Sequence, residues 1–323
     1  MTERAIAPVE RSACAKVILC GEHAVVYGRP AIALPLSWLR TRVRCAPAQA
    51  GFRILAPDVN RVYTPQADAE RPLIRLAAIT LDFVQSECPA RLPLHAFNAE
   101  LTIHSDIPPG AHLGSSAAVA VAVARALAAS LGRELSPDEA SALAFEAEKL
   151  FHGAPSGIDN TVVAYEQPVW FVRHSRQDAQ DTEIGPMTIP ALPHLVIADT
   201  GIATPTRIPV GDVRRGWEAA PERYERLFDR IGQIVVESRA ALAAGEWVRL
   251  GELMNANQDV LRELGVSCAE VDALCDAARI AGALGAKLSG GGRGGNIIAL
   301  ARDAQHAAEL RQTLLHVGAK RVM

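Results

Sequence analysis

The chain is 323 residues long and carries 33 lysines and arginines against 36 aspartates and glutamates, which gives a net charge of −3. This length suits two domains, each large enough to bury a core of its own. Because the charges are nearly balanced and no long run has one sign, a nucleic-acid stripe and a polybasic membrane patch are both disfavoured. A small-molecule partner is the better expectation.

The cysteines and the apolar segments indicate the compartment. Cysteines stand at positions 14, 20, 45, 88, 268 and 275, with no CxxC pair and no Cys/His metal spacing. A chain of this size does not depend on disulfides, so we expect reduced and mostly buried thiols. The N-terminal segment MTERAIAPVER has no apolar signal core. No apolar run is long enough to span a bilayer, which predicts a soluble cytoplasmic protein.

The first hundred residues are dominated by strand-like alternation. Strands are predicted at 13–20, 31–36, 40–45 and around 101–103. In the third of these, alternating arginines indicate a solvated face. Apolar residues at helical spacing predict a helix at 71–86. Lys16 falls inside the first strand, where its ammonium either reaches a carboxylate or phosphate or lies on a solvated face.

The stretch from Ser105 to Leu131 carries the clearest signal for a ligand site. Prolines and glycines at 108–114 lead into a helix that begins at Ser115. The first N–H groups of a helix have no partners inside it, and together with the helix dipole they attract anions, most often phosphate. Since Arg125 is the only charge in this helix, we expect it to be buried on nearly every side. A buried helix with a simple serine cap is the alternative.

A second helix has a complete N-terminal signature. Residues 136–139 combine an N-cap serine, a proline and a capping-box glutamate, which predicts a helix as far as Phe151. Glu146 and Glu148 lie about 200° apart around its axis, so at most one can face a site. The Pro/Gly-rich turn that follows presents Asp159, either as a functional carboxylate or as a turn former.

The polar stretch at 173–190 suggests a domain boundary, and we divide the chain into 1–185 and 186–323. Strands are predicted at 168–172, 195–198, 297–300 and near 321–322, and helices at 212–244 with a break at Pro221, 247–264, 268–284 and 303–316. The glycine run 290–295 formally reads GxGxxG. We reject a dinucleotide-binding turn because this run leads into a strand near the end of the chain, not from a first strand into a helix.

Four segments resemble the ordered motifs of the superfamily of galactokinase, homoserine kinase, mevalonate kinase and phosphomevalonate kinase, the GHMP kinases. They are KVILCGEHAVVYG (16–28), IPPGAHLGSSAA (107–118), HGAPSGIDN (152–160) and KLSGGGRGGN (287–296). The first and third are most similar to mevalonate kinases. The resemblance implies an α+β, two-domain GHMP-kinase fold, with an N-terminal domain like domain 2 of ribosomal protein S5 and a ferredoxin-like C-terminal domain. It also implies that ATP, with Mg²⁺, phosphorylates the C5 hydroxyl of (R)-mevalonate.

The same resemblance implies a catalytic pair and a set of substrate contacts. Asp159 would accept or orient the proton of the substrate hydroxyl. Lys16 would lie between Asp159 and the γ-phosphate and favour the charged carboxylate. Glu22 and His23 would hold the substrate, with Thr206 as a further contact.

Nucleotide and metal contacts are implied by two more motif matches. Glu148, and not Glu146, would bind Mg²⁺ together with the hydroxyl of Ser116, for which Ser115 is the alternative. The phosphates of ATP would be wrapped by Pro109, Gly110, Ala111, His112, Leu113, Gly114, Ser115 and Ser116.

Three positions depart from the family pattern. His112 stands where a glycine is usual, which puts the usual backbone path in doubt, and Asn296 stands where a cysteine is common. Arg293 replaces a small residue and either contacts phosphate or faces water.

Two alternative functions are also open. One is a sister GHMP kinase acting on the 3-hydroxyl of mevalonate or on a phosphorylated mevalonate, and the other is a non-catalytic ATP-binding sensor. The expected partner is mevalonate, with no nucleic acid and no membrane, and a homodimer is left open.

Overall fold

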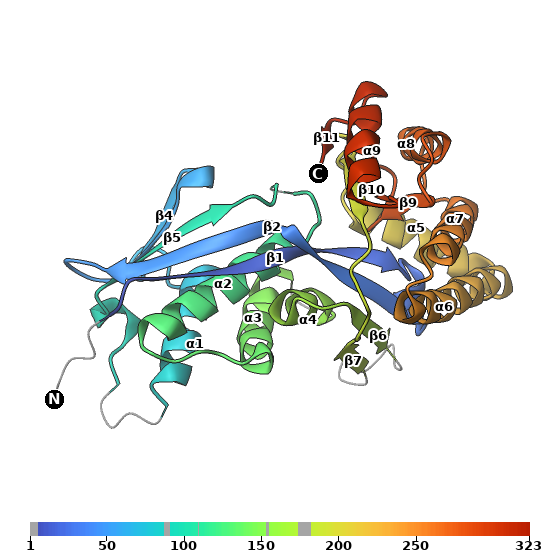
Figure 1. Cartoon of the computed structure of the whole chain (residues 1–323). Helices are drawn as coiled ribbons and strands as arrows, with labels where there is room; N and C mark the ends of the chain where they lie inside the picture. Colours follow the sequence, from blue (N-terminus) through green and yellow to red (C-terminus); the bar gives the residue numbers. More distant parts are fainter. Residues whose placement is uncertain (1–5, 87–90, 109, 153–154, 174–181) are drawn as a thin grey trace. The chain divides into compact units, whose positions relative to one another are not determined.

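The computed structural model describes residues 6–86, 91–108, 110–152, 155–173 and 182–323 (Figure 1). Contacts divide the chain into two compact units: unit 1 is Met1–Lys16 with Pro35–Gln167, and unit 2 is Val17–Leu34 with Pro168–Met323. Two long strands, β1 (Val9–Cys20) and β2 (Ala31–Pro47), contribute to both units. The domain boundary between 185 and 186 stays a prediction.

Unit 1 is a sheet with helices on one face (Figure 1). Its strands follow the order β4 (Arg61–Tyr63), β3 (Arg53–Ala56), β5 (Ala99–Ser105) and the second part of β2. Its helices are α1 (Pro72–Val84), α2 (Ser115–Ser130), α3 (Pro137–His152) and α4 (Ile158–Tyr165). The β5 strand pairs antiparallel with β2, with Ser105 opposite Thr41, and therefore delivers the chain to the start of α2.

Helix α2 is the buried centre of unit 1. Val121, Val123 and Leu127 have no exposed surface, as the near absence of charge in this helix predicts. The exception, Arg125, turns its guanidinium away from the helix and donates to the carbonyl oxygen of Ala164 at 2.5 Å. The Arg125 guanidinium therefore has a hydrogen-bond partner although α2 has no face exposed to solvent.

Local hydrogen bonds fix the helices that follow. The predicted capping box is confirmed, because the Ser136 N–H donates to Glu139 at 2.9 Å and the Glu139 N–H donates to the Ser136 hydroxyl at 3.2 Å. The side-chain amide of Asn160 donates to the Ser141 hydroxyl at 2.8 Å, and the Thr161 hydroxyl donates to the Gly157 carbonyl at 2.7 Å. These bonds attach α4 to α3 and set the direction in which α4 begins.

Unit 2 contains a four-stranded antiparallel sheet in the order β11 (Arg321–Val322), β8 (Leu195–Asp199), β10 (Asn296–Leu300) and β9 (Gly285–Ser289). Taken in chain order these strands lie 4-1-3-2, with helices between the first and second and between the third and fourth. This is the ferredoxin-like arrangement. Two further strands, β6 (Val169–Arg173) and β7 (Thr182–Pro186), extend from the first part of β2.

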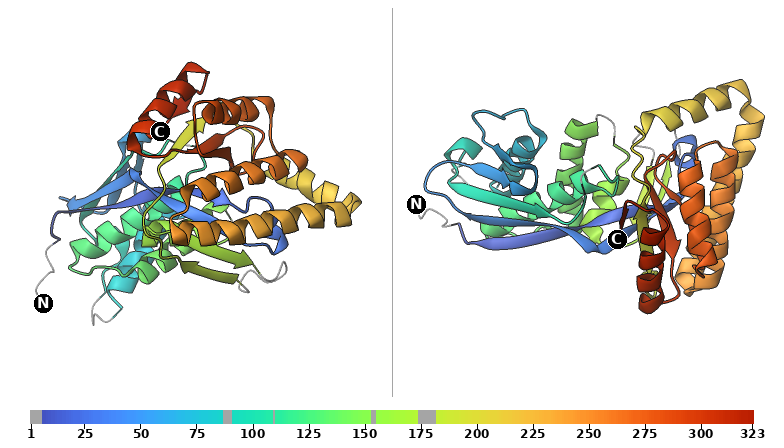
Figure 2. Two further views of the ribbon diagram at one scale, coloured as in Figure 1. Left: turned by 45° about the vertical axis from the view of Figure 1, so that its right-hand side comes forward. Right: turned by 90° about the horizontal axis from the view of Figure 1, so that it is seen from above.

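The helices of unit 2 are α5 (Arg207–Ala219), α6 (Pro221–Ala244), α7 (Trp247–Glu263), α8 (Ala269–Ile280) and α9 (Ala304–His316). Both views of Figure 2 show α8 and α9 along the four-stranded sheet. Helix α7 reaches β9 at two glycines, because a Cβ on Gly251 would lie 2.3 Å from the Leu284 carbonyl oxygen and one on Gly285 would lie 2.2 Å from the Gly251 carbonyl oxygen. This close approach holds β9 in place.

Several expectations about secondary structure need correction. The two strands predicted at 31–36 and 40–45 are one strand, β2, which changes from a continuously buried pattern to an alternating one. Arg40 is not simply solvated, because its guanidinium forms a two-bond pair with Glu166 at 2.7 and 3.0 Å. The helix predicted to 284 ends at Ile280, since Gly282 has φ +89°, and β9 begins soon after. Strand β7 is not predicted from the sequence. It lies at the edge of its sheet and has a polar composition, so it lacks the apolar pattern of a buried strand.

The cysteines in the described ranges agree with the expectation of reduced thiols. Cysteines 14, 20, 45, 268 and 275 are free thiols, and Cys88 lies outside the described residues. Short 3-10 turns occur at Ala24–Tyr27, Pro57–Val59 and Leu94–Ala96. Within the described ranges, no helix has the length and apolar character needed to cross a membrane.

Candidate active site

The central contact in unit 1 joins Lys16 and Asp159. The Lys16 ammonium nitrogen lies 2.8 Å from Oδ1 of Asp159, and the two side chains are 8% and 34% exposed. Asp159 stands in the first turn of α4, after Gly157, which has φ +88°. A carboxylate in this position is favoured by the helix dipole. The pair therefore combines a buried cation with an anion that is still accessible.

The predicted phosphate loop packs directly on Lys16. The Lys16 N–H donates to the Leu113 carbonyl oxygen at 2.9 Å. A Cβ on Gly114 would lie 2.8 Å from Cγ of Lys16, closer than real Cβ contacts allow. Only glycine lets the loop approach the lysine stem at this point, where φ is +73°. The start of α2 and the ammonium of Lys16 are therefore held next to each other.

The loop follows a glycine-like path in spite of His112. Gly110, His112 and Gly114 have φ of +71°, +56° and +73°, so alternate residues lie in the left-handed region. Histidine is thus in a conformation that glycine adopts freely and that costs an L-residue about 1 kcal/mol. The His112 side chain is exposed, while Ala111 and Leu113 are buried. Pro109 lies outside the described residues.

The two glutamates of α3 have opposite environments. Glu148 is 3% exposed, whereas the Glu146 side chain is 47% exposed and its carboxylate pairs with Lys149 at 2.6 Å. Ser116 lies in the first turn of α2, and α2 packs against α3. The described ranges hold no cluster of three or more His, Cys, Asp or Glu side chains suited to a metal ion.

The substrate residues predicted from the first motif lie in unit 2, around β9. Gly21 has φ +107°, and a Cβ there would lie 2.5 Å from Cα of Ala31, so glycine is required for the turn that presents Glu22. The Glu22 carboxylate pairs with the ammonium of Lys287 at 2.5 Å. Burial raises the pKa of the Glu22 carboxyl, and the Lys287 ammonium opposes that rise.

His23 and Thr206 both meet the glycine run at Gly291. Nε2 of His23 lies 3.0 Å from the Gly291 carbonyl oxygen and so carries the proton of that hydrogen bond. Burial lowers the pKa of His23 to about 4, which keeps the imidazole neutral at pH 7. A Cβ on Gly291 would lie 3.0 Å from Cγ2 of Thr206, at the N-terminal cap of α5. The glycine run is thus the meeting point of these two residues.

Arg293 forms contacts within unit 2 that the two alternatives from the sequence do not include. Its guanidinium pairs with Asp212 of α5, and its Nε donates to the Gly265 carbonyl oxygen at 3.1 Å. The hydroxyl of Thr204 donates to the Arg293 carbonyl oxygen at 2.6 Å. Arg293 therefore ties the glycine run to the segment before α5. Asn296, the third departure, is buried at the start of β10.

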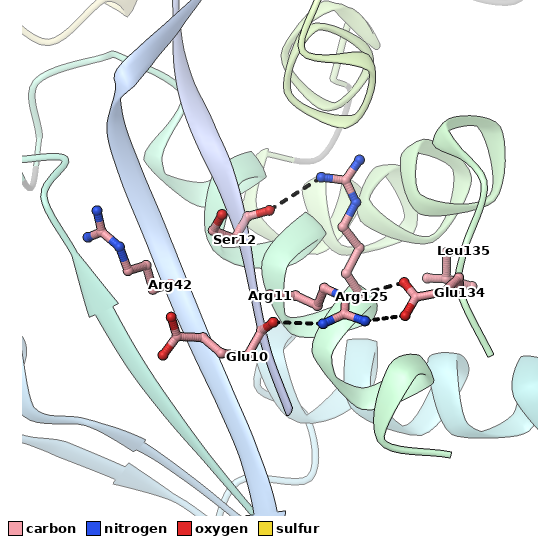
Figure 3. A pocket seen from close by; sticks show the side chains of 7 residues that line it. All are labelled: Glu10, Arg11, Ser12, Arg42, Arg125, Glu134 and Leu135. Atoms are coloured by element: carbon pink, nitrogen blue, oxygen red, sulfur yellow. Dashed lines mark hydrogen bonds and ion pairs between the residues drawn. The ribbon is translucent and has the colours of Figure 1, made fainter. Parts of the chain in front are cut away.

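A separate cavity of about 320 Å³ lies in unit 1 beside β1, and Figure 3 shows the side chains that line it. Its arginines are already bonded: Arg11 pairs with Glu134, Arg125 donates to a β1 carbonyl oxygen at 3.3 Å, and Arg42 pairs with Asp106 at 2.8 Å. None of the predicted site residues lines this cavity.

Lys287 is the site residue that sequence reasoning missed. It is fully buried in β9 and neutralises Glu22, which is remote along the chain. The sequence does contain a signal for this role. Lys287 stands among apolar residues in AKLS and, like Lys16, needs a carboxylate or phosphate partner if it is buried.

Comparison with known proteins places this geometry in a family. Residues 75–167 match the GHMP kinases N terminal domain and residues 238–320 match the GHMP kinases C terminal domain. The chain is 37% identical over 311 residues to the mevalonate kinase of Thermococcus sibiricus, covering 91% of this chain and 89% of that protein. The chain belongs to the mevalonate kinase family.

Two further relatives of the mevalonate kinase family support the assignment. The mevalonate kinase of Pyrococcus furiosus is 36% identical over 308 residues, again covering 91% of this chain and 89% of the relative. The crystal structure of L. major mevalonate kinase in complex with R-mevalonate superposes with a TM-score of 0.84 at 31% identity, over 100% of this chain and 97% of that one. The expected α+β two-domain GHMP-kinase fold is confirmed.

Proposed function

We propose that this protein transfers the γ-phosphoryl group of ATP to the C5 hydroxyl of (R)-mevalonate, forming ADP and 5-phosphomevalonate. The observation that carries the proposal is the 2.8 Å contact between Lys16 and Asp159, next to the glycine loop that opens α2. Phosphoryl transfer depends mostly on positioning and on electrostatic stabilisation, and this contact supplies a fixed cation and a carboxylate at one place.

Asp159 and Lys16 have different catalytic roles. The Asp159 carboxylate orients the C5 hydroxyl and accepts its proton as the O–P bond forms. The Lys16 ammonium pairs with that carboxylate and offsets negative charge on the moving phosphoryl group. Because Lys16 is buried and held by the loop at Gly114, the charge needs no rearrangement when the nucleotide binds.

The loop before α2 binds the phosphates of ATP. Residues 110–116 present backbone N–H groups at the positive end of a long helix, which is a favourable place for phosphate oxygens. The hydroxyl of Ser116 and the buried carboxylate of Glu148 would hold Mg²⁺. This oxygen-only set fits the ion, which takes one or two protein ligands and completes its shell with phosphate and water. When bound, Mg²⁺ neutralises charge on the phosphate oxygens.

The environment of the predicted substrate residues favours an unphosphorylated substrate. A second phosphate would call for available cations beside Glu22, His23 and Thr206. Two of the nearby cations are already paired, Lys287 with Glu22 and Arg293 with Asp212. Glu22 and neutral His23 are suited to hydroxyl groups, which can donate to a carboxylate or to an imidazole nitrogen.

An ADP-release assay over mevalonate, its phosphates, homoserine and galactose tests the proposal. Mevalonate should be the substrate with the highest kcat/KM, and carbon-13 and phosphorus-31 NMR of the product should place the phosphate on C5. Activity confined to another substrate, or a phosphate on the 3-hydroxyl, would replace the proposal with a sister kinase. ATP binding without turnover on any of them would indicate a sensor.

A further inference from the structure

Lys287 and Glu22 form the most deeply buried ion pair in the described part of unit 2. Nζ of Lys287 lies 2.5 Å from Oε1 of Glu22 and 2.6 Å from the carbonyl oxygen of Leu288, and the two side chains are 0% and 2% exposed. Removing two charges from water is costly, so such a pair is weak evidence for stability alone. A role other than stability is therefore needed to explain why this ion pair lies in the core.

Three titratable groups near the pair are neutral at pH 7. Burial raises the pKa of the Cys20 thiol on β1 and of the Cys275 thiol on α8 to about 12. Burial also lowers the pKa of His23 to about 4. Lys287 is therefore the cation in direct contact with the Glu22 carboxylate, and without it burial would favour the protonated acid.

Lys287 is itself held rigidly. The N–H of Leu288 donates to Oε1 of Gln258 on α7 at 2.9 Å, and this bond fixes the backbone next to Lys287. The hydroxyl of Ser289 donates to the carbonyl oxygen of Ile18 on β1 at 2.9 Å, and this bond fixes β9 to the strand that leads to Glu22. The cation on β9 and the turn after β1 that carries the carboxylate are thus held close together.

The second carboxylate oxygen of Glu22 has a different environment. The peptide N–H groups of Glu22 and Gly290 act on the carboxylate and favour its charged form. Nevertheless, Oε2 is buried and forms no hydrogen bond of ordinary geometry with the described residues. A buried carboxylate oxygen without a donor is energetically unfavourable unless another molecule supplies one. A ligand hydroxyl is the natural donor.

We propose that Lys287 is a positioning residue for substrate binding: it engages Oε1 of Glu22 and so reserves Oε2, with its negative charge, for a hydroxyl group of the substrate. The inference rests on the proposed substrate role of Glu22 and adds the residue that makes Glu22 competent. Lys287 acts through Glu22 and does not touch the substrate.

Steady-state kinetics of four proteins test this inference: wild type, Lys287→Met, Glu22→Gln and the double variant. We expect Lys287→Met to raise the KM for mevalonate at least about tenfold at pH 7 while the KM for ATP changes less than about twofold, because one charge-assisted hydrogen bond of the substrate is lost. As the pH is raised above 7, that KM should fall back toward the wild-type value, because Glu22 ionises again without its cation.

Glu22→Gln and the double variant should share one raised KM that does not vary with pH, because neither has a carboxyl group to titrate at this position. Arg249→Met is the matched control: Arg249 pairs with Glu237 at 2.6 Å in the same unit but at the surface, so its loss should leave both KM values unchanged. Thermal unfolding of each variant separates folding from binding.

Each outcome has a defined meaning. A KM in Lys287→Met that stays within twofold of wild type, or that rises equally at every pH, or that rises together with the KM for ATP, overturns the positioning role. If Lys287→Met does not fold, the double variant decides: a KM equal to that of Glu22→Gln supports the inference, and a further rise contradicts it. Wild-type protein without mevalonate-dependent ADP release contradicts the proposed function itself, and the inference falls with it.

Discussion

The ammonium nitrogen of Lys16 and Oδ1 of Asp159 are 2.8 Å apart, although one residue belongs to β1 and the other to the first turn of α4. The contact depends on two glycines. Gly114 allows the phosphate loop to lie against the lysine stem, and Gly157, with φ +88°, turns the chain into α4. The site therefore depends on backbone freedom as much as on charge.

Replacing the carboxylate of this pair should stop chemistry and spare nucleotide binding. We expect Asp159→Asn to lower kcat by about 10²- to 10⁴-fold, the range typical for loss of a general base. The affinity for ATP should stay within about threefold, because the phosphates bind to the loop and not to Asp159. Single-turnover kinetics and equilibrium nucleotide binding measure the two effects separately.

Asp106→Asn is a suitable control for that variant. Asp106 is an exposed carboxylate in the same unit, paired with Arg42 at 2.8 Å, so its loss should leave kcat unchanged. Near-normal turnover in Asp159→Asn would show that another group handles the acceptor hydroxyl.

The glycines at the two ends of α2 offer a test of the loop. Gly114 and Gly132 have φ of +73° and +80°, but only at Gly114 would a Cβ collide with a described side chain, that of Lys16. Both alanine variants should lose about 1–2 kcal/mol of unfolding free energy from left-handed strain. Only Gly114→Ala should also lower kcat, by at least about tenfold, because it displaces Lys16. Equal kcat values in the two variants would argue against the contact.

The two glutamates of α3 give a matched pair for the metal. Glu148→Gln should raise the Mg²⁺ concentration for half-maximal rate by about 10- to 100-fold, the loss expected when a charged ligand becomes neutral. Glu146→Gln, an exposed change two residues away, should leave the Mg²⁺ dependence as it is. A titration of rate against Mg²⁺ at saturating ATP distinguishes them, and similar curves for both variants would remove Glu148 as a ligand.

His23 should make the protein less stable in acid. Its pKa is lowered to about 4, whereas an exposed histidine titrates near 6.5. Between these values the unfolded chain binds a proton that the folded chain does not, so the unfolding free energy falls as the pH falls. The full contribution is about 3 kcal/mol.

His23→Asn, which retains a side chain tolerant of the positive φ of +60°, should lose this part of the pH dependence. Urea unfolding of both proteins at pH 7.5 and 4.5 gives the difference. If the two proteins lose the same free energy between these pH values, His23 is not the buried neutral group described above.

Much of this protein can be predicted from local patterns in its sequence. The capping box at Ser136, the buried character of α2 and the turn before α4 follow from short-range chemistry, since they depend on residues within a few positions of one another. Four ordered motifs indicate the family and, through the resemblance, predict that Lys16 and Asp159 act together.

The tertiary structure decided what depends on partners far along the chain. Arg40 was expected to be solvated and instead pairs with Glu166, Arg293 pairs with Asp212, and Lys287 is buried against Glu22. The physical reason is that periodicity reports which face of an element is buried, but the cost of burying a charge depends on which opposite charge the fold brings to it. The sequence alone thus determined the fold class and the catalytic motifs, and only the folded chain assigned each buried charge its partner.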